Sequence, residues 1–121
     1  MEFKRGNWKG GKALFEEIFQ VYGSDSQKYL FFGEVGSLLK AISQFERASG
    51  ISNMKNRRSE IANCIGNVEI MLNQLRLIYE IDDAEVNSCI ESRLAKMDYE
   101  LQQRIYNADR RLNDVIGFWI W

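Results

Sequence analysis

A line of polar side chains on one predicted helix is the part of this chain best suited to chemistry. Glu60, Asn63, Asn67 and Gln74 recur at helical intervals and border an apolar stripe, where they form either ordinary interhelical hydrogen bonds or a weak nucleotide or metal site. The chain has no histidine, which removes imidazole bases, Ser-His and Cys-His nucleophile pairs and histidine metal ligands. Catalysis would therefore have to depend on carboxylates and a hard cation such as Mg²⁺.

The surrounding sequence predicts four helices, because apolar residues recur at intervals of three and four. The chain also lacks proline, so nothing interrupts long helices. The expected spans are about 12–22, 26–48 with a left-handed cap at Gly50, 57–79, and a long helix beginning at Asp82. The stripes expected to face inward are Leu30, Val35, Leu38, Leu39, Ile42 and Phe45 in the second helix, and Ile61, Ile65, Val68, Leu72 and Leu75 in the third. The last helix carries Val86, Ile90, Leu94, Met97, Leu101, Ile105, Ala108, Leu112 and Val115 on one apolar stripe.

Size and charge set the outer limits of function. A chain of 121 residues is one ordinary domain, and 16 basic against 17 acidic residues do not favour nucleic-acid binding. No apolar run is long enough to span a bilayer, and the first residues lack a signal-peptide pattern, so we expect a cytoplasmic protein. Cys64 and Cys89 lie in apolar patterns and are predicted to be reduced and buried.

Several sequence blocks resemble the MazG-like, all-α nucleotide pyrophosphohydrolases, particularly the phage-type members. The blocks run from Val21 to Lys28, from Glu34 to Ile42, from Glu69 to Tyr79 and from Ile90 to Met97. Short connections make neighbouring helices antiparallel and predict a four-helix bundle, and the last helix is long for so small a core, so we expect a homo-oligomer, a dimer or a tetramer, to complete the bundle. The resemblance implies the same all-α fold. It also implies a bound Mg²⁺ between a Glu-Glu-x-x-Glu helix and a Glu-x-x-Asp helix.

Most of the acids of those two motifs are missing here. The first motif keeps Glu34, but Gly33 and Ser37 stand where the family would have glutamate. The second motif aligns in two registers, which remain open, as Glu60 with Asn63 or as Cys64 with Asn67. By resemblance, Glu34 and Glu60 would be the catalytic acids, Glu34, Glu60, Asn63 and Asn67 the metal ligands, and Arg93 and Lys96 the phosphate-binding cations.

Two functions follow, and we favour the first. In the first, the chain is a catalytically degenerate MazG-like protein that binds a nucleotide or a protein partner, for example as a phage-encoded inhibitor in a host cytoplasm. In the second, it is a Mg²⁺-dependent enzyme that splits a nucleoside triphosphate into monophosphate and pyrophosphate.

Two terminal segments complete the expected organisation. Residues 1–11 are predicted to form a flexible basic lead to the single all-α domain. Residues 117–121 form an apolar tail that either folds back on the core or provides, through Phe118, Trp119 and Trp121, candidate contacts to a second subunit or to a partner.

Overall fold

The computed structural model describes residues 11–120 of the chain, and side chains as far as Gly117. This part of the chain is all α-helical. Four helices are present: α1 (Gly11–Tyr22), α2 (Ser24–Glu46), α3 (Ile51–Ile78) and α4 (Asp83–Ile120). The chain divides into two compact units, one ending at Asp82 and the other beginning at Asp83. The prediction of four helices is confirmed, whereas the single MazG-like domain stays a prediction.

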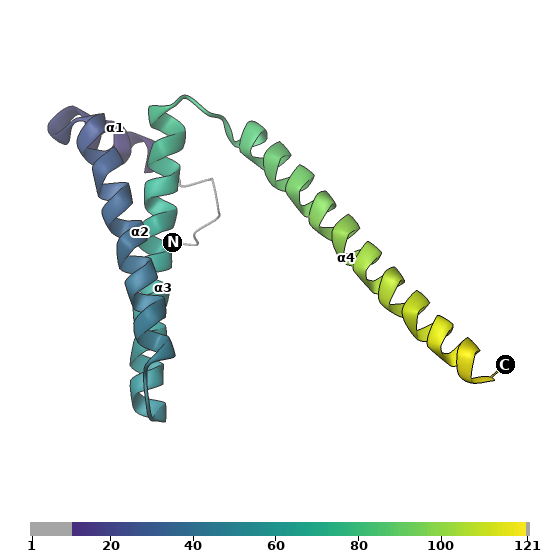
Figure 1. Cartoon of the computed structure of the whole chain (residues 1–121). Coiled ribbons are helices and arrows are strands. Elements are labelled where there is room, and N and C mark those ends of the chain that lie inside the picture. Colours follow the sequence, from purple (N-terminus) through teal and green to yellow (C-terminus); the bar gives the residue numbers. More distant parts are fainter. Residues whose placement is uncertain (1–10, 121) are drawn as a thin grey trace. The chain divides into compact units, whose positions relative to one another are not determined.

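Helices α2 and α3 form an antiparallel hairpin, with α1 packed against α2 (Figure 1). Gly23 and Gly50 directly precede α2 and α3, and both have positive φ angles, 83° and 86°, that L side chains rarely adopt. Gly50 was expected to end a helix. It begins one instead, because α2 already stops at Glu46 and the chain reverses direction over residues 47–50.

Helix α3 starts six residues earlier than the sequence pattern indicated, and it ends in a Schellman-type cap. Glu80 occupies the left-handed position of this cap with a φ of 55°. The backbone N–H of Ile81 donates to the carbonyl of Arg76 at 2.8 Å, and that of Glu80 donates to the carbonyl of Leu77 at 3.3 Å. The cap ends α3, the last helix of the first unit.

The fully buried set in the described chain is small. Phe15 of α1 and Ala41 of α2 are the buried apolar side chains, at 3% and 4% exposure. Two polar side chains, Gln27 and Gln74, are buried as deeply, and no described atom donates a hydrogen bond to Oε1 of Gln74. The small side chain of Ala41 suits the contact between α2 and α3, because it lets two helices approach closely.

The predicted inward stripes are only partly covered. Val35, Leu38 and Phe45 on α2 are half-buried, as are Ile61, Val68 and Leu75 on α3. The prediction is wrong for Leu30, Leu39, Ile42, Ile65 and Leu72, which are exposed, because two paired helices shield a narrower stripe than a full bundle does. The α4 stripe is exposed from Ile90 onward.

The two cysteines are free, as predicted. Cys64 is half-buried on α3, but Cys89 is exposed, so its predicted burial is wrong. The side chains around Cys89 on α4 are themselves exposed. No helix in the described residues has the length and apolar character needed to cross a membrane.

Candidate functional site

A pocket of about 260 Å³ lies between α2 and α3, and we call it the α2–α3 pocket. Helix α2 contributes one side of it and α3 the other. The lining residues are Ser37, Lys40, Ala41 and Gln44 from α2, and Arg57, Glu60, Asn63 and Cys64 from α3. The lining residues of each helix recur at intervals of three and four, so each helix contributes successive turns of one face. The pocket therefore combines two cations, one carboxylate and several neutral hydrogen-bonding groups.

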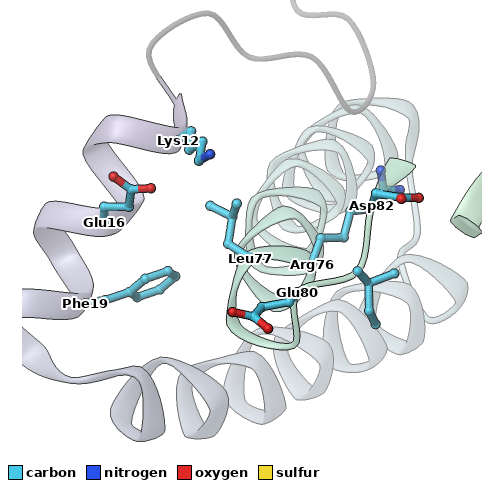
Figure 2. A pocket seen from close by; sticks show the side chains of 8 residues that line it. Lys12, Glu16, Phe19, Arg76, Leu77, Glu80 and Asp82 are labelled. Atoms are coloured by element: carbon cyan, nitrogen blue, oxygen red, sulfur yellow. The ribbon is translucent and has the colours of Figure 1, made fainter. Parts of the chain in front are cut away.

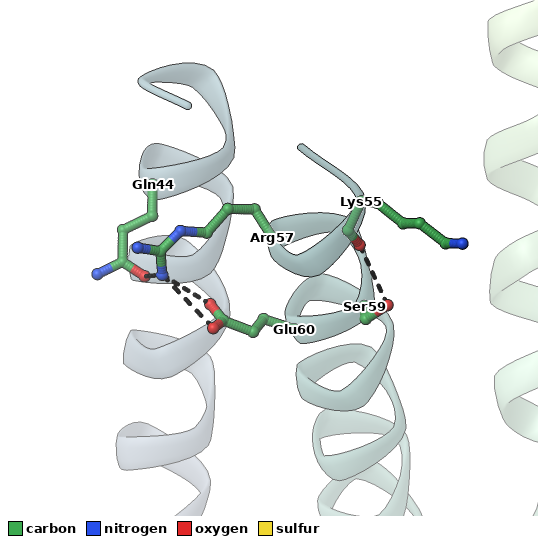
Figure 3. Close-up of polar contacts among 5 residues, drawn as sticks. All are labelled: Gln44, Lys55, Arg57, Ser59 and Glu60. Atoms are coloured by element: carbon green, nitrogen blue, oxygen red, sulfur yellow. Dashed lines mark hydrogen bonds and ion pairs between the residues drawn. The ribbon is translucent and has the colours of Figure 1, made fainter. Parts of the chain in front are cut away.

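The guanidinium group of Arg57 connects the two sides of this pocket (Figure 3). Nη1 of Arg57 donates to Oε1 of Gln44 at 3.1 Å. The same nitrogen donates to the two carboxylate oxygens of Glu60, at 3.1 Å and 3.4 Å. The Arg57 and Glu60 side chains are 37% and 51% exposed, so their ion pair contributes little to stability, about 0–1 kcal/mol. Its importance is electrostatic, because it neutralises the carboxylate of the pocket.

The structure brings some of the predicted site residues together and leaves others apart. Glu60 and Asn63 line the α2–α3 pocket, with Ser37 opposite them and Cys64 one turn further along α3. Each of the two open registers of the second motif thus places at least one residue at the pocket. Glu34 and Asn67 are half-buried on α2 and α3, but neither lines it.

The remaining predicted residues lie on α4 or in the two terminal segments. Arg93 and Lys96 are exposed on this helix, in the second unit, and the α2–α3 pocket is lined by residues of the first unit alone. The backbone of α4 continues to Ile120. The side chains of Phe118 and Trp119, all of Trp121, and the basic lead up to residue 10 lie outside the described residues.

The side chains that line the α2–α3 pocket do not fit Mg²⁺ well as metal ligands. Mg²⁺ requires several hard oxygen ligands, including carboxylates, in a nearly octahedral arrangement. The pocket provides one carboxylate, on Glu60, which already accepts hydrogen bonds from Arg57, and Lys40 adds a second positive charge. Among the described residues, no three Cys, Asp or Glu side chains are grouped as metal ligands. A negatively charged ligand suits this environment better than a cation does.

A second, larger pocket of about 450 Å³ lies between α1 and the end of α3 (Figure 2). Phe19, Leu77 and Ile81 form its apolar surface. Charged residues of both signs stand around them: Lys12, Glu16, Arg76, Glu80 and Asp82. The mixed charges and the open apolar surface do not define one class of ligand, so the α2–α3 pocket is the better candidate site.

The sequence assigned none of Lys40, Gln44 and Arg57 to the site, although Arg57 lies in a basic cluster with Lys55 and Arg58. One signal for Arg57 was present, since Arg57 and Glu60 have the three-residue spacing of a helical ion pair. No local signal identifies Lys40 or Gln44, because their place in the pocket depends on the alignment of α2 with α3.

Comparison of the chain with protein-family models, with curated proteins and with solved structures finds no match in any of the three. The four-helix architecture is therefore established from the structure itself, and the MazG-like resemblance remains a hypothesis.

Proposed function

We propose that this chain is a binding protein of degenerate MazG-like type, and that its α2–α3 pocket accepts the phosphate groups of a nucleotide without hydrolysing them. The position of Arg57 carries the proposal. A guanidinium held by Gln44 and Glu60 is oriented across the pocket and provides a planar set of donors suited to phosphate oxygens. Lys40 adds a second cation at the same pocket.

The charges of the pocket support binding over catalysis. In metal-dependent phosphate chemistry, carboxylates hold the cation and orient the attacking water. Here Ser37 stands where the resemblance would place a carboxylate, and Glu60 is paired with Arg57. With Lys40, Arg57 and Glu60 ionised, the lining carries one net positive charge, so phosphates enter without a metal to neutralise them.

The enzyme is the alternative, and one observation favours it: Glu60 and Asn63 line the same pocket. An incoming Mg²⁺ would have to displace Arg57 from Glu60, and the ion pair is exposed enough for this to cost little. In that case Glu60 would be a metal ligand, and Glu34 would be the second acid.

The test measures nucleotide binding and nucleotide hydrolysis in one experiment. Purified protein is titrated with a panel of ribo- and deoxyribonucleoside triphosphates, first in EDTA and then in Mg²⁺, and chromatography of each mixture follows the products. The proposal expects binding in EDTA and no monophosphate in either buffer. Removing one charged hydrogen-bond donor should weaken binding by about tenfold or more, so we expect this effect for Arg57→Gln and for Lys40→Gln.

Lys55→Gln is the matched control, because Lys55 also lies on α3 but does not line the α2–α3 pocket (Figure 3). If Lys55→Gln and Arg57→Gln weakened nucleotide binding equally, the attraction would be non-specific electrostatic attraction to basic residues of α3, and the pocket assignment would be refuted. Monophosphate production that Glu60→Gln and Glu34→Gln both abolish would establish the enzyme instead.

A further inference from the structure

Helix α4 is 38 residues long and has an apolar stripe that is exposed along most of its length. The stripe consists of Val86, Ile90, Leu94, Met97, Leu101, Ile105, Ala108 and Leu112 and continues to Ile116, whereas Val115, expected on the stripe, lies beside it at the eleven-residue position of Arg93 and Arg104. Leu94, Leu101 and Leu112 are 57%, 54% and 59% exposed. A continuous exposed apolar surface along a helix of this length usually marks an interface. A helix of this kind also depends on packing of its apolar face for most of its stability.

The spacing of the stripe specifies what can cover it. Its intervals repeat as four, four and three, so Val86, Met97 and Ala108 are separated by eleven residues each time. Eleven residues over three turns give 3.67 residues per turn, which produces a nearly straight pair of helices with a slight right-handed twist. The apolar intervals of α3 are four and three, as in Ile61, Ile65 and Val68, and belong to the seven-residue type. The described helix that matches the stripe of α4 in length and period is α4 itself.

Charged residues beside the stripe differ in sign between its two sides. One side carries Glu91, Asp98 and Asp109, with the amides Asn87, Gln102 and Asn113 between them. The other side carries Arg93, Arg104 and Arg111, with Glu100 as the exception. All of these residues are exposed. An acidic edge and a basic edge therefore run along the same helix.

These edges determine the direction of pairing. When two copies of one helix pair in parallel about a two-fold axis, the left edge of each meets the right edge of the other. The acidic edge then faces the basic edge on both sides. In an antiparallel pair, like edges meet, and the acidic residues of the two copies would face one another. Flanking charges of this kind set partner and orientation in coiled coils.

We propose that α4 pairs in parallel and in register with α4 of a second copy of this chain, forming a two-stranded, nearly straight coiled coil. Arg93 of one copy lies across from Asp98 of the other, and Arg104 lies across from Asp109, each pair offset by five residues. Both pairs straddle stripe residues and recur after eleven residues, as the apolar positions do. This inference is independent of the proposed ligand of the α2–α3 pocket, because no residue of α4 lines that pocket.

Disulfide trapping tests the direction of pairing in the full-length chain. Cys64 and Cys89 are first replaced by serine, and Ile90→Cys and Leu112→Cys are then introduced separately. Parallel, in-register pairing predicts that each variant cross-links to itself under mild oxidation. An equal mixture of the Ile90→Cys and Leu112→Cys variants, one of them carrying a mass label, should give disulfide-linked dimers joined at position 90 in both copies or at position 112 in both copies. Antiparallel pairing with the stripes aligned would give the mixed 90–112 product, and this result would overturn the proposal. Absence of any intermolecular product would overturn it as well.

Sedimentation equilibrium tests whether the stripe is the interface. The wild-type chain should have twice its 14.1 kDa monomer mass. Leu101→Glu places a carboxylate on the stripe of both copies, and we expect it to weaken dimerisation by at least about a hundredfold. Gln103→Glu is the matched control, because it introduces the same residue on the opposite face of α4, and it should leave the dimer within about threefold of wild type. A monomeric or trimeric wild type, or equal effects of the two variants, would refute the proposal. Circular dichroism confirms that both variants remain helical.

Discussion

Replacing Gln74 with leucine should stabilise the first unit. The Gln74 side chain is 3% exposed, and its Oε1 accepts no hydrogen bond within the described structure. A buried acceptor without a donor costs about 1–3 kcal/mol. Leucine has a similar volume and no polar atom, so Gln74→Leu removes this cost and keeps most of the packing.

The expected gain is about 1–2 kcal/mol, which allows for some loss of packing around the new side chain. For a unit of this size, each kcal/mol raises Tm by about 4–8 °C. The measurement is thermal and urea unfolding followed by circular dichroism at one fixed protein concentration, because association changes apparent stability. Gln20→Leu on α1 provides the matched control. Gln20 is exposed, so its replacement should change stability by no more than about 0.5 kcal/mol.

The reasoning would be refuted if Gln74→Leu lost more than about 1 kcal/mol, since Oε1 would then receive a hydrogen bond in solution. Gln74→Glu sharpens the result. It keeps the shape of the side chain but buries a carboxylate, which is costly without a partner. This variant should be destabilised at neutral pH, and acidification should recover part of the loss, because protonation removes the buried charge.

Two further predictions concern the turn that joins α2 to α3 and the opposite, open end of the hairpin, where the start of α2 lies beside the end of α3. Gly50→Ala should destabilise the chain by about 1–3 kcal/mol, because Gly50 has a φ of 86° that alanine rarely adopts. Gly36→Ala, inside α2, should stabilise the chain by about 0.5–1 kcal/mol. An added Cβ meets no atom within 4 Å at either position, so equal effects of the two variants in urea unfolding would contradict the backbone explanation. The pKa of Lys28 is raised above its ordinary value, chiefly by its hydrogen bond to Asp25 and also by Tyr79, whose ring centroid is 5.0 Å from Nζ. This contribution to stability is present in full below the ordinary lysine pKa and is lost as pH rises through the raised value, so urea unfolding at pH 9 and pH 11.5 should show a smaller alkaline loss in Lys28→Met than in wild type.

The sequence predicted the helices better than the site. Apolar periodicity located α1, α2 and α4 to within about two residues at the ends we predicted. It missed the start of α3, because residues 51–56 contain only Ile51 and Met54 as apolar positions and both are exposed. Glu60 and Asn63 were assigned to one site and do line one pocket. Their neighbours Lys40 and Gln44 could not be predicted, since only the register of α2 against α3 brings them there.

Burial was the least predictable property. Periodicity identifies which face of a helix is apolar, but it does not identify what covers that face. For α2 and α3 the cover is the other helix, and it reaches Val35 and Val68 but not Leu39 or Leu72. For α4, intervals of three and four could not distinguish a face turned toward its own chain from one turned toward another copy.

The short reversal between α2 and α3 also has a consequence for folding kinetics. The two helices are joined by residues 47–50, so their contacts close a small loop and connect residues that are near in sequence. Local contacts of this kind allow helical proteins to fold within microseconds to milliseconds, whereas synthesis proceeds at about 5–20 residues per second. The hairpin can therefore fold rapidly once its residues are outside the ribosome, because its contacts lie within one chain. Folding of the first unit would precede any pairing of α4, which is a bimolecular step whose rate depends on the concentration of finished chains.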